Sequence, residues 1–296
     1  MRIITALFTF IFLLITASMS AQQLEKDSFV TKKGQLDITF IKHGSLLFTY
    51  NGNTIYVDPV SDYADYSKLP KADVILITHE HADHFDPKAI TDLKKESTVL
   101  VLNPAAQRQL GEGMAMKNGD AQQLTPYLYV EAVPAYNHEV EPEVKGSDKN
   151  DVSLLIIDET NLIFLEEEKN DKRKKKNEKE VAQPEPVKPK QAAPKREVYH
   201  PRNRDNGYVL TIDDKRIYVA GDTEDIIEMM ELKDIDIAFL PVNQPYTMTP
   251  KQAANAALMF NPTILYPYHY GATRIEELQD RLYYDKHIEV RIRQLQ

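Results

Sequence analysis

Three histidines and two aspartates lie within eight residues of this chain, in the segment Thr78-His79-Glu80-His81-Ala82-Asp83-His84-Phe85-Asp86. The segment directly follows the apolar run Val74-Ile75-Leu76-Ile77, which has the length and composition of a buried strand. In extended backbone His79 and His81 point to the same side, because side chains alternate between the two faces of a strand. Imidazole and carboxylate groups together are typical ligands of zinc and similar divalent cations. The segment therefore predicts a metal site at a strand end, with the candidate ligands His79, His81, Asp83 and His84.

The composition limits what else could hold such a metal. The chain has 296 residues and no cysteine, so disulfides, zinc-thiolate sites and cysteine nucleophiles are excluded. The zincin helix motif is excluded too, since His79-Glu80 would need a histidine at position 83 and the chain has Asp83. The alternative is a polar loop with solvated histidines. Three of the chain's eight histidines lie in one hexapeptide, which favours the metal site.

The N-terminus has the pattern of a secretory signal peptide. Arg2 precedes an apolar run over residues 3–17, and the small residues Ser18, Ser20 and Ala21 follow. The run is short for a membrane span and carries no cysteine for lipid attachment. We expect cleavage after a signal peptide at 1–21, a single mature domain at 22–296 without a transmembrane anchor, and a periplasmic or secreted location.

The order of elements repeats along the chain. Apolar runs at 36–41 and 46–50 are strand-like, and an Asn-Gly turn, typical of a hairpin, separates the second of them from a run at 54–58. Strands at 74–77 and 99–102 alternate with helices that begin at Pro87 and Pro104. The second half has a hairpin at 208–220, strands at 235–240, 263–266 and 288–292, and a helix that begins at Pro250. The pattern predicts an α/β protein, a four-layer αββα sandwich whose strand-end loops meet along one edge.

A charged segment interrupts this pattern. Apolar runs at 152–157 and 161–165 are consistent with a hairpin, and residues 166–197 are rich in lysine, glutamate and proline. Such a composition buries too little apolar surface to fold, so we expect a disordered charged insertion. An alternative is an electrostatic tether to an acidic partner or an anionic surface. The chain as a whole has a formal net charge of −9, which argues against a nucleic-acid substrate.

Three further candidate ligands follow predicted strands. They are His138, Asp222 and His269, and with the first four they make seven, enough for two divalent ions that share a carboxylate. A structural alternative exists for Asp222, which could cap a helix over residues 224–230. His43 and His287 have no comparable context, and we assign them structural roles.

The His-x-His-x-Asp-His pattern, a Gly-Asp-Thr after a later hairpin and a terminal Pro-x-His resemble the metallo-β-lactamase superfamily. The resemblance is strongest to the branch of L-ascorbate-6-phosphate lactonase-like metal-dependent hydrolases, and N-acylphosphatidylethanolamine phospholipase D is more distantly similar. The motifs that carry it are Lys42-His43-Gly44-Ser45, Asp58-Pro59, Thr78 to His84, Val133-Pro134-Ala135, Asn206-Gly207-Tyr208, Ala220-Gly221-Asp222-Thr223, Tyr246-Thr247-Met248-Thr249-Pro250 and Pro267-Tyr268-His269-Tyr270.

The resemblance implies the αββα fold and a division of the ligands. His79, His81 and a third histidine would hold one metal, Asp83, His84 and His269 the other, and Asp222 would bridge them. Relatives tend to place the third histidine directly after Pro-Ala-aromatic, where this chain has Asn137. His138 comes one residue later, and on a regular strand such a slip faces the opposite side. We choose His138, with His200 beyond the insertion as the alternative.

These observations lead to a hydrolase that uses two divalent metal ions, with zinc as the leading candidate and manganese or iron as alternatives. We expect a metal-bound hydroxide to attack an ester, lactone or phosphodiester in a small-molecule or lipid-like substrate, while Asp83 orients that hydroxide or accepts its proton. Two alternatives stay open: hydrolysis of β-lactams, and a non-catalytic metal- or partner-binding protein that acts through the charged insertion. Strand-end loops with Tyr63, Tyr66, Asn243, Gln244 and Tyr246 are candidates for the substrate pocket.

Overall fold

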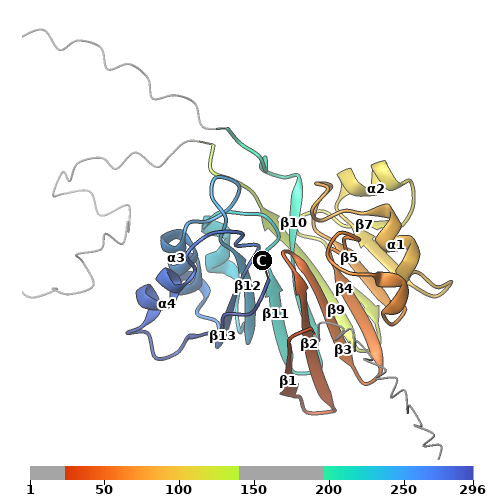
Figure 1. Cartoon of the computed structure of the whole chain (residues 1–296), viewed down its shortest axis with the longest axis horizontal. Coiled ribbons are helices and arrows are strands. Elements are labelled where there is room, and N and C mark those ends of the chain that lie inside the picture. Colours follow the sequence, from red (N-terminus) through yellow and green to blue (C-terminus); the bar gives the residue numbers. More distant parts are fainter. Residues whose placement is uncertain (1–23, 140–196, 296) are drawn as a thin grey trace, which may run out of the picture.

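Two mixed β-sheets lie face to face, with helices on the outer side of each (Figure 1). The structure, a computed structural model, describes residues 24–139 and 197–295. The expected signal peptide, the hairpin at 152–165 and nearly all of the charged insertion lie outside the described residues. Among the described residues the predicted four-layer αββα sandwich is confirmed.

The first sheet contains seven strands in the order of the sequence. The strands are β1 (Lys26–Val30), β2 (Gln35–Lys42), β3 (Ser45–Tyr50), β4 (Asn53–Val57), β5 (Val74–Ile77), β6 (Val99–Leu102) and β7 (Met114–Ala115). Strands β1 to β4 are antiparallel, and β4 to β7 are parallel. The connections of the parallel part contain the 3-10 helix η1 (Tyr66–Lys68) and the helices α1 (Pro87–Leu93) and α2 (Pro104–Leu110).

The second sheet repeats this arrangement. Its strands are β8 (Ala121–Thr125), β9 (Leu128–Ala135), β10 (Asp205–Ile212), β11 (Lys215–Val219), β12 (Ile237–Pro241), β13 (Ile264–Tyr268) and β14 (Glu289–Val290). Strands β8 to β11 are antiparallel and β11 to β14 parallel, with the 3-10 helix η2 (Ile227–Glu231) and the helices α3 (Pro250–Phe260) and α4 (Glu276–Leu282) in the connections. The repeat predicted from the sequence is thus confirmed.

Local sequence explains where the main helices begin. Asp86, Asn103 and Thr249 each precede a proline and accept a hydrogen bond from a backbone N–H of the first turn. Thr249 and Gln252 also form a reciprocal capping box. These caps fix the points at which the loops after β5, β6 and β12 end, and so they define the lengths of those loops.

The structure departs from the local sequence patterns at four places. Residues 26–30 form the edge strand β1, which pairs with β2 and has an ion pair between Lys26 and Asp37. Strand β8 was not expected, because an edge strand with polar side chains lacks an apolar pattern. The helix expected at 224–230 is the 3-10 helix η2, and Asp222 does not cap it. The last strand is limited to Glu289–Val290.

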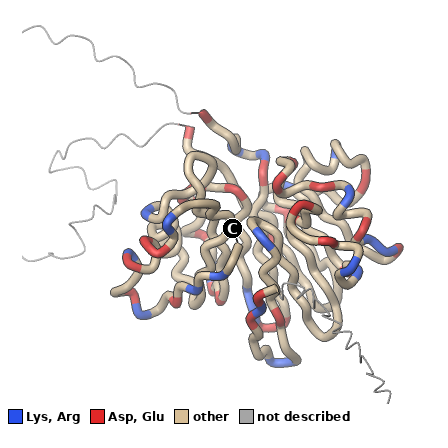
Figure 2. The backbone as a smooth tube through the Cα atoms, viewed as in Figure 1, with Lys and Arg blue, Asp and Glu red and all other residues tan. Residues whose placement is uncertain are grey.

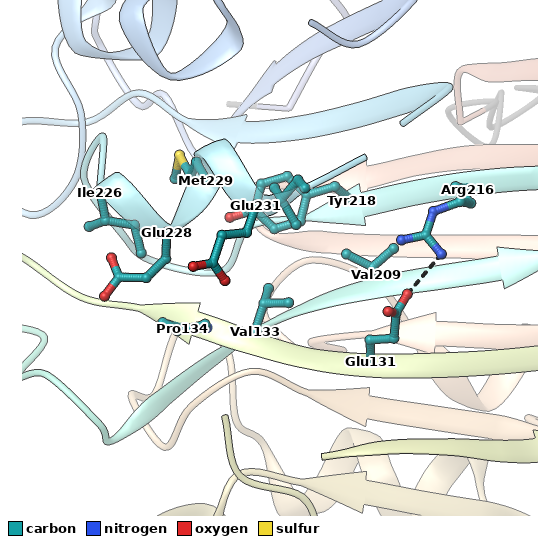
Figure 3. A pocket seen from close by; sticks show the side chains of 11 residues that line it. Glu131, Val133, Pro134, Val209, Arg216, Tyr218, Ile226, Glu228, Met229 and Glu231 are labelled. Atoms are coloured by element: carbon teal, nitrogen blue, oxygen red, sulfur yellow. Dashed lines mark ion pairs between the residues drawn. The ribbon is translucent and has the colours of Figure 1, made fainter. Parts of the chain in front are cut away.

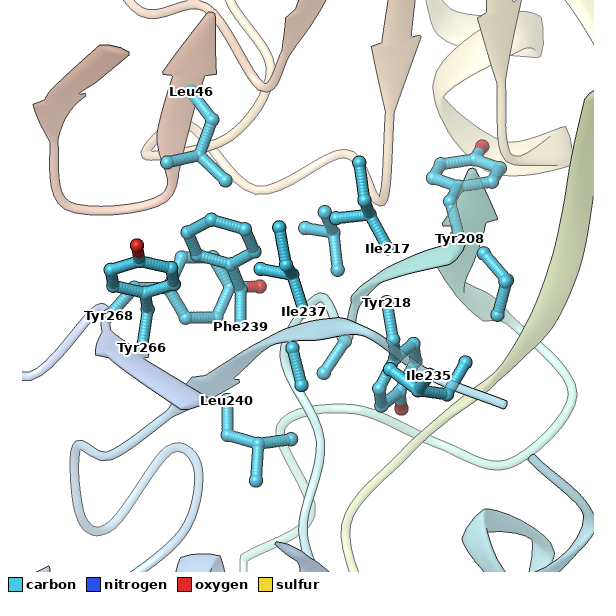
Figure 4. Packing of buried hydrophobic residues seen from close by; sticks show 14 of the residues in the cluster. Leu46, Tyr208, Ile217, Tyr218, Ile235, Ile237, Phe239, Leu240, Tyr266 and Tyr268 are labelled. Carbon is cyan, nitrogen blue, oxygen red and sulfur yellow. The ribbon is translucent and has the colours of Figure 1, made fainter. Parts of the chain in front are cut away.

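The main core lies between the sheets. Phe239 and Ile237 point from the second sheet toward Leu46 of the first, and Phe239 stacks on Tyr266 with ring centroids 5.1 Å apart (Figure 4). At the edge where the strand ends meet, Tyr208 donates a buried hydrogen bond of 2.8 Å to the carbonyl oxygen of Ile77, the last residue of β5. This bond holds the ends of β5 and β10 together. Among the described residues no helix is long and apolar enough to cross a membrane.

Candidate metal centre

Five separate segments bring histidine and aspartate side chains to one point at the strand ends. The loop after β5 supplies four of them, and His43, His200, Asp222 and His269 come from the segments after β2, before β10, after β11 and after β13. Asp222 is the meeting point. Its Oδ2 lies 3.4 Å from His200 Nε2, 3.2 Å from His269 Nε2 and 3.9 Å from His79 Nε2, and its Oδ1 lies 3.3 Å from His84 Nε2.

The side chains form two adjoining groups. His79, His81 and His200 make the first group, and the second consists of His43, Asp83, His84 and His269. Within each group the potential ligand atoms all lie within 4.8 Å of one another. Asp222 contacts members of both groups, so its carboxylate lies where a bridging ligand would be needed. The division of ligands that the resemblance implies is therefore compatible with this geometry.

The loop after β5 is held by a buried carboxylate, Asp58, at the end of β4. Thr78 donates to Asp58 from its backbone N–H at 2.8 Å and from its hydroxyl at 2.6 Å. Asp58 Oδ2 also lies 2.8 Å from His84 Nδ1. A carboxylate on one ring nitrogen orients the imidazole and leaves the other nitrogen for a metal. Gly44 leaves room for this ring, since a Cβ there would lie 2.7 Å from His84 Cε1.

A second buried carboxylate orients His200. Its Nδ1 lies 3.0 Å from Asp205 Oδ2, so the opposite nitrogen, Nε2, faces Asp222. Asn103, the N-cap of α2, donates to Asp205 Oδ1 at 3.4 Å. The two histidines that flank Asp222, His84 and His200, thus have the same support: a buried aspartate on Nδ1 and Asp222 near Nε2.

His138, chosen as the third histidine, lies apart from the other candidate ligands. Its Nε2 lies 3.4 Å from Asp225 Oδ1, its backbone N–H donates to Glu224 at 2.8 Å, and it belongs to neither ligand group. The chain has left β9 after Ala135, and His138 therefore points to the η2 side. His200, the alternative named from the sequence, takes the place beside His79 and His81 with ring centroids 4.9 and 4.8 Å away.

His43 is a site residue that sequence reasoning missed. Its Nε2 lies 3.2 Å from Asp83 Oδ2, and its ring centroid is 3.7 Å from that of His269. The position of His43 in the sequence could have indicated this role, because His43 directly follows β2. The end of β2 lies at the same edge as the ends of β5 and β13. The structural role given to His43 is therefore corrected. His287 is exposed on the surface and belongs to neither group.

The charges of the cluster are strongly coupled. Burial favours a neutral Asp222, but His269 and His84 outweigh it and hold the pKa of that carboxyl well below its usual range. Burial likewise opposes protonation of His200, yet Asp205 and Asp222 raise its pKa to about 9. The pKa of His84 and that of His269 are also raised, against burial, chiefly by Asp222. In the metal-free protein His200 is therefore protonated at pH 7.

Two members of the first group, His79 and His81, differ in this respect. Burial lowers the pKa of His79 well below its usual value, and the positive charge of neighbouring His84 adds to the effect. Burial and His200 lower the pKa of His81 in the same way. Both rings are therefore neutral at pH 7, which is the form that binds a metal.

A pair of divalent cations fits the residues present. The side-chain atoms His79 Nε2, His84 Nε2, His269 Nε2 and Asp222 Oδ1 are fully buried and form no well-aligned hydrogen bond among the described residues, although the Asp222 carboxylate lies 3.9, 3.3 and 3.2 Å from the three ring nitrogens. Leaving such a group unsatisfied costs about 1–3 kcal/mol each, and all four face the same point. Histidine nitrogens with carboxylate oxygens form a donor set that suits zinc, manganese and iron.

The candidate pocket residues lie in different places. The ring of Tyr63 packs 5.5 Å from that of His43, and the exposed Tyr246 packs against Tyr199 with centroids 4.8 Å apart. Tyr66 is buried and accepts a hydrogen bond from the Val60 N–H, so it supports the loop instead of lining the pocket. Asn243 and Gln244 lie in the loop after β12, where Asn243 is partly buried and Gln244 exposed.

A separate hollow lies on the outer face of the second sheet, between η2 and β9 to β11 (Figure 3). An ion pair of 2.9 Å between Arg216 and Glu131 crosses one end of it. It contains none of the residues of the two ligand groups. The chemistry of the described residues is therefore concentrated at the strand ends.

Comparisons with known proteins agree with this geometry. The model of the β-lactamase superfamily domain matches residues 37–269. The crystal structure of a candidate metal-dependent hydrolase from Parabacteroides distasonis is 50% identical, covers 92% of this chain and 100% of its own, and superimposes with a TM-score of 0.71. A metal-dependent hydrolase from Solibacter usitatus is 25% identical in an alignment 271 positions long, which covers 83% of this chain and 92% of the relative.

A metallo hydrolase from the archaeon Ignicoccus hospitalis is 20% identical and covers 88% of this chain and 95% of its own, with a TM-score of 0.59. At that identity the likeness concerns the fold alone. The family match spans most of the chain and includes the loop after β5, Asp222 and His269. The chain therefore belongs to the β-lactamase superfamily, and it is a metal-dependent hydrolase.

Proposed function

We propose that the chain holds two divalent metal ions, with zinc as the leading candidate, and hydrolyses an ester, lactone or phosphodiester bond. The observation that carries the proposal is the convergence of four buried, unsatisfied ligand atoms on and around Asp222. His79, His81 and His200 would hold the first ion, and Asp83, His84 and His269 the second, with Asp222 between them. When bound, the ions would lower the pKa of water and polarise an oxygen of the substrate.

Asp83 is the residue best placed to handle a proton. Its side chain is 43% exposed, whereas those of His84 and Asp222 are almost fully buried, so Asp83 lies where substrate and water enter. Burial raises its pKa, but contacts with His269 and His43 outweigh burial and keep the pKa of this carboxyl low. An ionised carboxylate at the entrance can orient the attacking water and accept its proton. His43 holds Oδ2 of that carboxylate at 3.2 Å.

The substrate that we propose is a small-molecule or lipid-like ester, lactone or phosphodiester. The aromatic rings of Tyr63 and Tyr246 near the cluster favour a substrate with an apolar portion. Acidic and basic residues are interspersed along the described chain (Figure 2), and the formal net charge is −9. A nucleic-acid backbone is therefore not the expected partner.

We also propose that the protein acts after export to the periplasm or the medium. The support is the apolar run at 3–17 with the small residues that follow it. N-terminal sequencing of the protein recovered from the producing cell would test this. A mature N-terminus near residue 22 is the expected result, and a protein that keeps Met1 in the cytoplasm would contradict it.

The function is tested by metal analysis together with a substrate panel. We expect about two divalent ions per chain and turnover of at least one phosphodiester, lactone or carboxylic ester, with a β-lactam as a further member of the panel. In His81→Ala the metal content and the turnover should both fall, because one of three first-group histidines is lost. Tyr56→Phe is the control, since it removes only a buried hydrogen bond of 2.8 Å to Pro70. Unchanged metal content and turnover in His81→Ala would refute the proposal.

A further inference from the structure

Asn137 makes an unusual set of hydrogen bonds next to the candidate metal centre. It is 1% exposed, and it lies two residues past the end of β9. Its Oδ1 accepts from the backbone N–H of Tyr199 at 3.1 Å and of His200 at 2.9 Å. Its Nδ2 donates to the carbonyl oxygen of Tyr246 at 2.8 Å. Its backbone N–H donates to the carbonyl oxygen of His200 at 2.8 Å.

These contacts join three segments that are far apart in the sequence. Positions 137 and 200 are 63 residues apart, and positions 137 and 246 are 109 apart. Bringing such distant segments together carries an entropic cost, which local contacts must offset. Asn137 contacts the backbone of His200 on both sides, at its N–H and at its carbonyl. Because the N–H and the carbonyl of His200 are both held, the backbone at this residue is fixed. The His200 side chain can then move only by rotation about its own bonds.

The remaining rotation of His200 is limited by Asp205, which lies 3.0 Å from Nδ1. Backbone and ring are thus fixed by different residues, Asn137 and Asp205. A ligand held in this way needs no rearrangement when a cation binds, and residues that orient metal ligands typically contribute 10–100-fold to metal affinity. Asp205 is the familiar kind of support, a carboxylate on the ring. Asn137 would act on the backbone.

The same amide also fixes the aromatic rim. Tyr199 directly precedes His200, and its ring packs against that of Tyr246 at 4.8 Å. Asn137 bonds to the backbone of both tyrosines, through Oδ1 and Nδ2 respectively. The two polar atoms of the Asn137 amide therefore hold different segments. Oδ1 holds the segment of His200, and Nδ2 holds the loop after β12.

We propose that Asn137 is a positioning residue of the metal centre, which places His200 as the third histidine of the first ion and fixes the Tyr199–Tyr246 rim beside it. The inference rests on the proposed function, since it assumes that the first group binds a cation. It assigns to Asn137 no contact with substrate. It predicts that loss of Oδ1 weakens one metal position and leaves the other unchanged.

Cobalt(II) titration of the full-length, metal-depleted protein tests this, because visible absorption reports each occupied site. The wild-type protein should take up two ions. Asn137→Ala should bind one ion with unchanged affinity and the other about 10–100-fold more weakly. Asn137→Asp keeps the Oδ1 acceptor, but it replaces the donor to Tyr246 with a carboxylate oxygen and adds a buried negative charge, so its loss of cobalt affinity should be smaller than that of Asn137→Ala but not zero. The unchanged second ion shows within the same sample that the variant is folded.

Comparison with His200→Ala identifies the affected position. If Asn137 acts through His200, the double variant should bind no more weakly than His200→Ala alone, because the two changes remove one interaction. Tyr56→Phe is the control for the loss of a buried hydrogen bond, and both of its cobalt affinities should equal the wild-type values.

The outcomes separate the inference from the function. A wild-type protein that takes up no cobalt overturns the proposed function and the inference with it. If the wild type binds two ions and Asn137→Ala binds both with unchanged affinity, the inference alone is overturned. The same holds if Asn137→Ala binds both ions more weakly by an equal factor, or if the double variant binds cobalt more weakly than His200→Ala. Selective weakening of one ion in Asn137→Ala, larger than in Asn137→Asp, supports it.

Discussion

The two halves of the molecule have the same architecture but different chemistry. Strands β5 and β12 occupy equivalent places in their sheets, and the loop after each ends in a capped helix that begins with proline. The loop after β5 carries His79, His81, Asp83 and His84, whereas the loop after β12 carries Asn243, Gln244 and Tyr246. The repeated framework therefore determines where loops meet, and the side chains on each loop determine what the site does.

The halves also differ in how they reach the site. The first half supplies four candidate ligands from one continuous loop, held by Asp58, and adds His43 from the end of β2. The second half supplies single residues from three segments: His200, Asp222 and His269. A site of this kind requires that both halves fold, because neither contains a full ligand set. The experiments below test this division of labour, starting with the largest expected effect.

Replacing His84 should cause the greatest loss. His84→Ala leaves Asp58 and Asp222 buried with one cationic partner fewer, and we expect the free energy of unfolding of the metal-free protein to fall by about 3 kcal/mol. One metal ion per chain should be lost as well. Thermal unfolding and metal analysis measure the two effects.

The matched change in the other half is Asn243→Ala, on the loop after β12. Its metal content and its unfolding temperature should stay near the wild-type values, because no ligand is removed. If Asn243→Ala lost as much metal as His84→Ala, the proposed difference between the two loops would be wrong.

Metal affinity should depend on pH. In the metal-free protein the pKa of His200 is raised to about 9, so its ring is protonated at pH 7 and must lose that proton before it can bind a cation. The metal affinity should therefore rise with pH up to about 9 and fall as the pH decreases. The expected change is up to about tenfold per pH unit for each proton released. Chelator competition at pH 6, 7 and 8 measures this dependence.

Calorimetry in buffers of different ionisation enthalpy should show proton release on metal binding. The lowered pKa of His79 and that of His81 mean that these two rings contribute no protons at neutral pH. In His200→Ala fewer protons should be released per ion. An affinity that is independent of pH would contradict the charge state described for the cluster.

The smallest effect is expected at His43. His43→Gln removes the ring that lies 3.2 Å from Asp83 Oδ2, while a glutamine amide can still approach the carboxylate. We expect turnover to fall by about tenfold, in the range typical of residues that orient a metal ligand, with both ions retained. Steady-state kinetics and metal analysis provide the measurements. His287→Gln, at an exposed position, is the control. Turnover of His43→Gln equal to that of the control would show that Asp83 needs no such support.

Much of the fold could be predicted from local patterns. The apolar run before His79 predicts β5, and Asp86-Pro87, Asn103-Pro104 and Thr249-Pro250 predict the helix starts, because capping depends on neighbouring residues alone. The edge strands β1 and β8 could not be recognised in this way. Their side chains are largely polar or exposed, and pairing with β2 and β9 stabilises them.

The sequence by itself determined the ligands of the loop after β5, together with Asp222 and His269, as candidates for one site. Each of them directly follows a strand, and strand ends meet at one edge of a sheet. Only the tertiary structure decided between His138 and His200, and only it brought His43 to Asp83. The physical reason is that the position of a ligand depends on where its segment lies in the folded protein. Hydrogen bonds between residues far apart in the sequence, such as those of Asn137, set that position, and no local sequence pattern contains them.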